Sequence, residues 1–220
     1  MVEDWPLRRD LVEVAQRCEA YGLVLRSQGN FSARIPGTNR ILITPTGLPY
    51  STMRPGDIVE LELDGRILRE PHAPSYEVPV HLAAYRSDAR IGACAHTEPP
   101  YINALYALNK TLPNVLGNFV HAFAGKGLAV GPRMKSGSPA FAAANVEAMG
   151  DRFGVVWPNH GLFCVGRTLE VAFIRSLHAE QAAQVYYLAI ALEGREPILL
   201  PASEQAAIVE SARKGGWDSP

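Results

Sequence analysis

The sequence predicts an α/β fold, a single three-layer domain in which a mixed central β-sheet is flanked by helices on both faces. Short apolar runs typical of strands are interspersed with amphipathic stretches typical of helices, without the strict alternation of a parallel βαβ protein. The 220 residues show no internal repeat, low-complexity tract or domain linker. With 47% hydrophobic residues, a chain of this length can bury one sizeable core.

The first third of the chain is predicted to begin with a helix and to continue into strands. Apolar residues recur at helical spacing over Leu7–Tyr21, and Gly22 is a natural stop. The polar segment Gln28–Arg34 leads through a Pro-Gly turn to a buried strand over Ile41–Thr44. Ile58–Leu63 alternates with acidic residues as a half-buried strand, and the Asp-Gly pair after it signals a hairpin.

The rest of the chain is predicted to alternate helices with short buried strands. The helix after residue 74 has Ser75 as a natural N-cap and Glu77 in its first turn. In order, the later elements are a strand closed by Ala95–Pro99, a helix over Pro100–Leu108, a helix over Pro139–Met149, a strand pair around His160 and an Ala-rich helix over Leu169–Leu192. The tail from Gly215 to Pro220 is expected to be mobile.

Composition excludes several classes of partner. The 21 basic residues are scattered against 22 acidic ones for a net charge of -1, so no basic stripe for nucleic acid is present. No apolar run approaches the roughly 18 residues of a membrane span, and no signal peptide precedes the domain, which predicts a cytoplasmic protein. The three cysteines are widely spaced in apolar sequence and are expected to be buried free thiols: Cys18, Cys94 and Cys164.

Side chains that can bind metal follow two of the predicted strands. His96 and Glu98 lie two residues apart on an extended segment, so both should point to the same side. His160 lies at a strand-to-strand turn beside a glycine. Glu77 at a helix start is well placed for proton transfer. His81, one turn later, either supports the site residues from behind or is merely a structural partner for that carboxylate, and the structural role is favoured.

Two imidazoles and a carboxylate form a recognised donor set for a divalent metal with open coordination positions. Taken singly, a histidine in apolar sequence is more often a hydrogen-bonded structural residue. The segment His96-Thr97-Glu98 also matches the H-x-E of zinc nucleobase deaminases, but those enzymes need a Pro-Cys-x-x-Cys element that this sequence lacks. The favoured interpretation is a divalent metal site of another kind.

Five segments in this order resemble the successive motifs of the class II aldolase/adducin family, the group that contains fuculose-phosphate aldolase and ribulose-phosphate 4-epimerase. The segments are Gly29–Arg34, Ile43–Tyr50, Pro74–Glu77, the His96 segment and Asn159–Gly161. The resemblance runs from about residue 7 to residue 200 and so covers the core of a single domain spanning 1–220. It implies the class II aldolase-like form of the three-layer fold.

The resemblance also implies chemistry. The family holds a divalent ion, usually zinc, with two histidines of an H-x-H segment and a later His of a His-Gly turn, which makes His96 and His160 ligands here. Glu77 corresponds to the residue that transfers a proton, while the metal polarises the substrate and stabilises an enediolate. Family members are mostly cyclic tetramers with active sites at subunit interfaces, so a homotetramer is expected.

Glu98 departs from the family pattern, because it stands where the family has the second histidine of H-x-H. A carboxylate adds a negative charge and a hard oxygen, and the resulting site suits Mn²⁺, Fe²⁺ or Mg²⁺ better than three histidines do, while zinc stays compatible. We predict that His96, Glu98 and His160 bind Zn, Mn or Fe. If Glu98 does not ligate, a weak or empty site is the alternative.

A second departure concerns the substrate. The predicted substrate-binding residues are Asn30, Thr46, Gly47, Ser75 and Tyr76. In the family's phosphate-binding aldolases the segment before the catalytic acid reads Ser-Ser-Glu, and Tyr76 replaces the second serine. A phenol there should crowd a phosphate, which predicts a non-phosphorylated substrate.

The predicted function is a metal-dependent carbon–carbon lyase, an aldolase or a decarboxylase, acting on a small hydroxy-carbonyl or keto-acid substrate through an enediolate or enolate. The tyrosine that the family's aldolases carry on a later loop is missing, and His121 or Tyr101 are candidates for the proton donor. The alternatives are a sugar-phosphate aldolase or epimerase, and a non-catalytic interaction module like the adducin heads.

Overall fold

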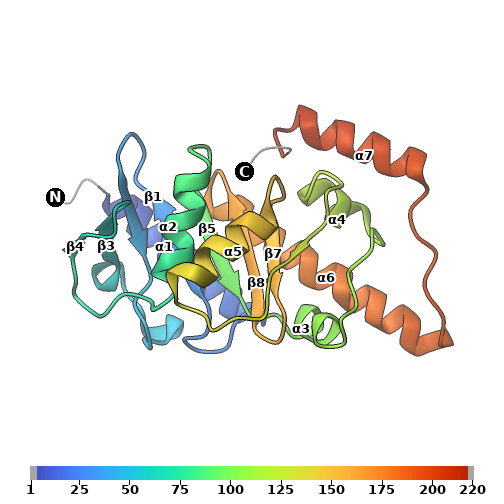
Figure 1. Ribbon diagram of the computed structural model, residues 1–220, viewed down its shortest axis with the longest axis horizontal. Helices are drawn as coiled ribbons and strands as arrows, with labels where there is room; N and C mark the ends of the chain where they lie inside the picture. The colour runs from blue at the N-terminus through green and yellow to red at the C-terminus, as the bar shows by residue number, and fades with distance from the viewer. Residues whose placement is uncertain (1–3, 218–220) are drawn as a thin grey trace.

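The computed structural model describes residues 4–217, and its centre is an eight-stranded sheet in the order β4-β3-β2-β1-β5-β8-β7-β6 (Figure 1). Neighbouring strands are antiparallel except for the parallel pair β6 and β7. The predicted mixed sheet is confirmed. The strands are β1 (Asn30–Arg34), β2 (Arg40–Ile43), β3 (Val59–Glu62), β4 (Ile67–Arg69), β5 (Ala93–Thr97), β6 (Ala129–Val130), β7 (Gly154–Trp157) and β8 (Gly161–Gly166).

Helices cover both faces of the sheet. The helices are α1 (Trp5–Ala20), α2 (Val78–Ser87), α3 (Pro100–Ala107), α4 (Gly117–Ala122), α5 (Pro139–Met149), α6 (Leu169–Glu193) and α7 (Ala202–Lys214). Helices α2 and α5 contact each other on one face, and α1 and α6 contact each other on the opposite face (Figure 1). Helix α7 lies at one end of the molecule and packs on α4, which itself packs on α6. The predicted three-layer arrangement is therefore present.

The alternation of side chains along β5 decides which layer each residue faces. Ala93 and Ala95 belong to the apolar core beneath α1, while Cys94 belongs to the core that includes α2. Because the side-chain period of a strand is two, His96 points to the same layer as Cys94. The chemistry of this strand therefore faces α2.

The structure corrects one predicted helix start. Ser75 is not the N-cap of α2: Glu77 is, and Ser75 Oγ accepts a hydrogen bond from the Glu77 N–H at 3.2 Å. Pro79 explains the shift, since proline is favoured in the first helical turn, where its missing N–H costs nothing. The capping position thus falls on the candidate acid/base residue itself.

The C-terminal part contains an element that the sequence interpretation omitted. Helix α7 was not predicted, and it carries the chain to Trp217, whose carbonyl accepts a hydrogen bond from Arg175 Nη2 at 2.9 Å. The ring of Trp217 lies 5.4 Å from that of His121. Trp217, within the tail expected to be mobile, therefore contacts the rest of the protein, and residues 218–220 lie outside the described residues.

Two further expectations concern the chain as a whole. None of the helices between residues 4 and 217 has the length and apolar character that crossing a membrane requires.

The prediction of buried free thiols is confirmed for Cys18, Cys94 and Cys164. Burial raises the pKa of Cys94 and Cys164 to about 12, which leaves both as inert thiols at neutral pH.

Candidate metal and active site

His96 and His160 meet because their strands are neighbours. Strand β5 pairs with β8, and β8 pairs in turn with β7. The turn between β7 and β8 follows Trp157 and ends with His160. Asn159 in this turn adopts a left-handed backbone with φ of 62°, which asparagine tolerates better than most residues. The turn therefore brings His160 to the end of β5, where His96 lies.

Glu77 completes a cluster with the two histidines. Its Oε2 lies 3.4 Å from His96 Nε2, and its Oε1 lies 3.3 Å from His160 Nε2. One potential ligand atom from each of Glu77, His96 and His160 lies within 4.8 Å of the other two. The rings of the two histidines are 4.9 Å apart and nearly perpendicular. Three segments far apart in the sequence thus direct donor atoms at one point.

The cluster fits a divalent cation. Glu77 Oε1 and His96 Nε2 are buried and have no hydrogen-bond partner in residues 4–217, which is a costly state for polar atoms. In a tetrahedral site with metal–ligand bonds of about 2.0–2.1 Å, ligand atoms lie about 3.3–3.4 Å from one another. Each ring nitrogen lies at about this distance from one of the two oxygens of Glu77, His96 from Oε2 and His160 from Oε1.

The protonation state of His96 is the one that a metal ligand needs. Its Nδ1–H donates to the carbonyl oxygen of Leu162 at 3.2 Å, which leaves the Nε2 lone pair facing Glu77. Burial lowers the pKa of His96 to about 4. Burial, and next the charge of His96, lower the pKa of His160 to about 4 as well. Both imidazoles are therefore neutral at pH 7, as metal ligation requires.

The two oxygens of Glu77 lie in different environments. Asn30 Nδ2 donates a hydrogen bond to Oε2 at 2.7 Å, whereas Oε1 is the unpartnered atom. Burial raises the pKa of this carboxyl above its usual value, against the opposing hydrogen bond from Asn30. A carboxyl with a raised pKa exchanges protons more readily near neutral pH, which suits an acid/base residue.

A glycine makes room for the cluster. A Cβ atom at Gly161 would lie 2.3 Å from the carbonyl oxygen of Thr97 and 2.7 Å from His96 Cε1. It would also lie 3.3 Å from Glu98 Cγ, so the side chains of His96 and Glu98 both border this glycine. The expectation that these two side chains point to the same side stays a prediction. The ring position of His96 depends on the absence of a side chain at residue 161.

Glu98 lies beside the cluster but is not a member of it. The cluster whose ligand atoms lie within 4.8 Å of one another holds Glu77 in the carboxylate position. Glu98 accepts a hydrogen bond from the backbone of Gly29, and its pKa is raised by burial and, to a smaller extent, by the charge of Glu77. Two of the three predicted ligands, His96 and His160, are thus brought together with Glu77.

The predicted substrate residues form two groups. Asn30 and Ser75 are buried and bonded to Glu77, through the Asn30 amide and through the Ser75 hydroxyl. Thr46 and Gly47 lie in the loop after β2, and this loop is tied to the segment before Ser75 by the hydrogen bond from Thr46 N to the Ala73 carbonyl at 2.9 Å. The first group therefore contacts Glu77, whereas the second is joined by this hydrogen bond only to the segment that precedes Ser75.

Tyr76 lies at the surface beside Ser75. Tyr76 is 60% exposed. Its ring borders Gly137, where an added Cβ atom would lie 2.9 Å from Tyr76 Cδ2. Partial burial, and next the charge of Glu77, raise the pKa of its phenol. The tyrosine therefore sits against the loop before α5 and remains largely open to solvent.

A cleft of about 350 Å³ opens beside His160. Trp157 and Phe141 contribute aromatic walls, and Arg133 and Lys135 bring positive charge. The Trp157 ring lies 4.4 Å from that of His96. The sequence interpretation did not single out Trp157, Arg133 or Lys135. The Trp-Pro-Asn-His run places Trp157 next to His160 and so could have identified it. Arg133 and Lys135 lie in a loop that carries no recognisable motif.

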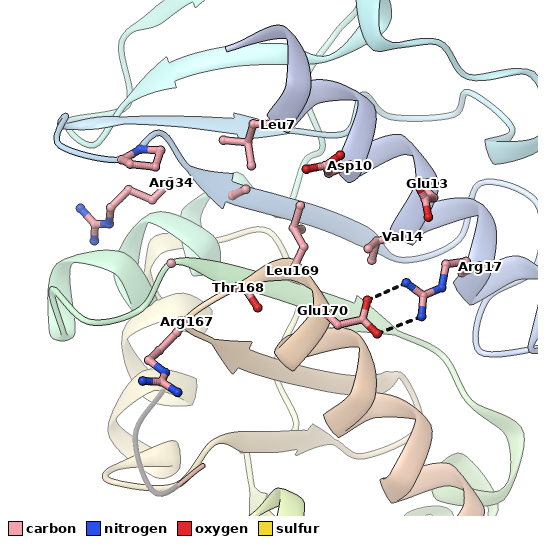
Figure 2. Close-up of a pocket in the computed structure, with 13 residues that line it drawn as sticks. Leu7, Asp10, Glu13, Val14, Arg17, Arg34, Arg167, Thr168, Leu169 and Glu170 are labelled. Carbon is pink, nitrogen blue, oxygen red and sulfur yellow. Dashed lines mark hydrogen bonds and ion pairs between the residues drawn. The ribbon is translucent and has the colours of Figure 1, made fainter. Parts of the chain in front are cut away.

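A second cleft, of about 560 Å³, lies between α1 and the start of α6 (Figure 2). In this view Arg17 and Glu170 face each other across its wall, joined by two hydrogen bonds of 2.6 and 2.9 Å. The cleft lies on the α1 side of the sheet, whereas the donor atoms of the cluster lie on the α2 side. Its greater volume therefore does not mark it as the site of chemistry.

Comparisons with known proteins agree with this geometry. The sequence model of the family "Class II Aldolase and Adducin N-terminal domain" matches residues 9–187. The 5-deoxy-D-ribulose 1-phosphate aldolase of Bacillus thuringiensis serovar kurstaki is 34% identical over 90% of this chain and 91% of its own length. The 5-methylthioribulose-1-phosphate/5-deoxyribulose-1-phosphate aldolase of Rhodospirillum rubrum is 30% identical over 96% and 92%.

Solved structures show the same likeness. An L-fuculose 1-phosphate aldolase matches with a TM-score of 0.86 and 25% identity, over 94% of this chain and 96% of that one. The L-fuculose-1-phosphate aldolase from Thermus thermophilus matches with a TM-score of 0.74 and 26% identity, over 87% and 98%. The predicted α/β fold and the prediction of an enzyme of the lyase class are confirmed. The chain belongs to the class II aldolase and adducin family.

Proposed function

We propose that this protein is a divalent-metal-dependent aldolase that cleaves a ketose 1-phosphate into a three-carbon ketose phosphate and an aldehyde. The observation that carries the proposal is the convergence of the unpartnered atoms Glu77 Oε1 and His96 Nε2 with His160 Nε2 in a chain that belongs to this family. A divalent ion in such a site polarises a substrate carbonyl and stabilises the negative charge that develops on its oxygen.

His96 and His160 are the imidazole ligands, and the cation is zinc, manganese or iron(II), which a set of two imidazoles and a carboxylate accepts. The carboxylate in contact with the two rings is that of Glu77. Ligation by Glu98 is the second arrangement, supported by its spacing of two residues from His96 and by the border that both side chains share with Gly161. The metal contents of Glu77→Gln and Glu98→Gln distinguish the two.

Glu77 moves the proton at the substrate carbon. When the bond between C3 and C4 of the ketose breaks, its electron pair passes to C3 and the adjacent carbonyl, and the C4 hydroxyl loses its proton to the Glu77 carboxylate at Oε1 and becomes the aldehyde. Glu77 then delivers this proton to C3, which completes the ketose phosphate and returns the carboxylate to its ionised form. Asn30 keeps Oε2 fixed during this exchange.

The expectation of a non-phosphorylated substrate is corrected by the relatives, whose names specify 1-phosphate sugars. That expectation assumed that the phenol of Tyr76 fills the phosphate position. Tyr76 instead is largely exposed and lies against Gly137, so it borders the region without filling it. A phosphate therefore has access to the segment around Ser75.

The phosphate is bound by Thr46 and Gly47 of the loop after β2, together with Ser75 and the free amide hydrogen of Asn30. Tyr76 lies at the edge of this site. Arg133 and Lys135 line the cleft beside His160 and make the approach to the site more positive for a dianionic substrate.

In its working form the enzyme is a cytoplasmic homotetramer, as expected for a chain of this family with buried free thiols.

A cleavage assay tests the proposal. The metal-loaded enzyme is offered 5-deoxyribulose 1-phosphate and L-fuculose 1-phosphate, with the unphosphorylated sugars as matched controls, and dihydroxyacetone phosphate is measured by coupled reduction. We expect cleavage of a phosphorylated sugar and at least a 100-fold lower kcat/KM without the phosphate, about 2.7 kcal/mol. Release of carbon dioxide from a keto acid, with no cleavage of either phosphate, would identify a decarboxylase and contradict the proposal.

A further inference from the structure

A line of buried polar side chains runs from Glu77 into the interior of the protein. Asn30 joins Glu77 Oε2 at 2.7 Å and His81 Nε2 at 2.5 Å through the two atoms of its amide. On the other side of the ring, His81 Nδ1 lies 2.6 Å from Ser32 Oγ, and Ser32 Oγ lies 2.8 Å from the Tyr85 hydroxyl. Each of the five residues is buried.

Two elements supply these residues in register. Glu77, His81 and Tyr85 follow one another at four-residue intervals along one side of α2, beginning at its N-cap. Asn30 and Ser32 are two apart on β1 and face that helix, while Phe31 between them belongs to the core beneath α1. The side chains from the strand alternate with those from the helix, so that every hydrogen bond in the line joins one element to the other.

The direction of the hydrogen bonds follows from the chemistry of the first member. An ionised carboxylate can only accept, so Asn30 must donate Nδ2–H to Glu77 and present Oδ1 to His81. The ring of His81 must then carry its proton on Nε2, and its Nδ1 accepts the hydroxyl hydrogen of Ser32. Tyr85 in turn donates to Ser32. The reverse order requires a protonated Glu77 and the other tautomer of His81.

Every other residue in this line has a hydrogen-bond partner within the line, whereas one carboxylate oxygen of Glu77 has none. Oε2 is fixed by Asn30, but Oε1 has no partner within residues 4–217 and lies 3.3 Å from His160 Nε2. His81 is joined to Glu77 through Asn30, the arrangement of a residue that supports the site from behind, which is one of the two roles expected for it.

We propose that Ser32 and His81 are positioning residues: Ser32 fixes the tautomer of His81, and His81, through Asn30, holds Glu77 with its Oε2 beside His96 and its Oε1 beside His160. The inference rests on the proposed function for the role of Glu77. It assigns a use to two residues, Ser32 and His81, that are too deeply buried to contact a substrate.

Ser32→Ala tests the proposal, with Ser176→Ala as its matched control. Both serines are fully buried, but the Ser176 hydroxyl donates to the Ala172 carbonyl within α6 and lies beside the Cys164 thiol, neither of which belongs to the line from Glu77. We expect Ser32→Ala to lower kcat and the affinity for added Mn²⁺ or Zn²⁺ by about 10- to 100-fold with KM changed less than about threefold. Ser176→Ala should leave all three quantities within about twofold. Equal kcat and metal affinity in the two variants would overturn the proposal.

His81→Gln and His81→Phe provide a rescue test if Ser32→Ala folds poorly. A glutamine can still donate to Asn30 Oδ1, whereas phenylalanine cannot, so kcat should be at least tenfold higher in the glutamine variant. A merely structural role predicts that the two variants differ in thermal stability while kcat per metal-loaded chain is equal. That equality would also contradict the proposal.

The tautomer of His81 gives a readout that does not depend on turnover. Long-range proton–nitrogen NMR spectra of the ¹⁵N-histidine-labelled wild type should show the His81 proton on Nε2 at pH 7, and a proton on Nδ1 would overturn the proposed order. Failure of the proposed function appears separately, as a wild type that cleaves no ketose phosphate. In that case the tautomer and the metal affinities still decide whether the line positions Glu77.

Discussion

At the scale of single residues, Glu77 concentrates the chemistry, because its two oxygens differ. One oxygen is fixed by Asn30, and the other is buried, unpartnered and close to His160. A buried carboxylate without a counter-charge is unfavourable, and the raised pKa of Glu77 reflects this burial. A cation between Glu77 and the two neutral imidazoles would compensate the charge at the position where the atoms already converge.

The metal contents of two carboxylate variants should differ. We expect Glu77→Gln to lose most of its bound metal and to lower kcat by about 10²- to 10⁴-fold, since it removes both a ligand and the acid/base group. Glu98→Gln should keep more than half of the metal, because Glu98 lies outside the cluster. Plasma mass spectrometry of the two purified variants measures this. Loss of metal from Glu98→Gln with retention in Glu77→Gln would assign the ligand role to Glu98.

The buried His81 should make the metal-free protein sensitive to acid. Burial, and next the charge of His96, lower the pKa of His81 to about 3, so the native state keeps this ring neutral. The unfolded chain takes up the proton below about pH 6.5, and protonation therefore favours unfolding as the pH falls. From His81 alone, the free energy of unfolding should decrease by about 2 kcal/mol between about pH 7.5 and about pH 5.

Urea unfolding of the chelated wild type and of chelated His81→Gln at the two pH values isolates this contribution. The decrease should be about 2 kcal/mol smaller in the variant, because glutamine does not titrate. The same decrease in both proteins would show that His81 is protonated in the native state or that its pKa is not lowered.

At the scale of elements, the sequence predicted those helices and strands that carry strong periodic patterns. Helix α5 has the predicted bounds Pro139–Met149, and α6 ends one residue later than expected. Helix α4 is short, and α7 is mostly exposed, so both lack the wide apolar stripe on which such predictions depend. The start of α2 was displaced by two residues because Pro79 defines the first turn.

The packing of α7 on α4 depends on a glycine. Gly125 follows α4 with φ of +73°, and a Cβ there would lie 2.7 Å from Val209 Cγ2 on α7. Gly127 has a similar φ of +64° but no atom within 4 Å of the Cβ position. Gly127→Ala should therefore cost about 1 kcal/mol from the left-handed backbone alone, and Gly125→Ala about 1–3 kcal/mol more.

Denaturant unfolding of the two glycine variants measures this difference, and Val209→Ala provides the internal control. In a Val209→Ala background the extra cost of Gly125→Ala should disappear, because the overlapping methyl group is gone. An unchanged extra cost in that background would mean that α7 does not press on Gly125.

At the scale of the whole molecule, the site is assembled from segments that only the sheet order brings together. His96 and His160 could be proposed from their local sequence, but their contact follows from the pairing of β5 with β8 and β7, which no local pattern specifies. The link from Asn30 to Glu77 was missed for the same reason, since it spans 47 residues and depends on β1 lying beneath α2. Resemblance to a family supplied the roles, while the structure supplied the distances.

Exposed apolar side chains at the C-terminal end of α6 lead us to expect an oligomer. Leu192 and Ile198 are 83% and 93% exposed, and both line a shallow cleft at the turn after this helix. Exposed apolar side chains in one place are unfavourable in a monomer. Light scattering after size-exclusion chromatography should give four times the chain mass of 23.9 kDa. Ile198→Asp should lower that mass and Ile198→Leu should not, whereas a wild-type monomer would contradict the expectation.

The metal content of the purified protein tests the central claim most directly. After dialysis against Zn²⁺ or Mn²⁺ and removal of free ions, plasma mass spectrometry should find about one ion per wild-type chain and less than about one-tenth of an ion in His96→Gln and in His160→Gln. A wild type that retains no ion, or histidine variants that retain as much as the wild type, would contradict the account that Glu77, His96 and His160 form a metal site.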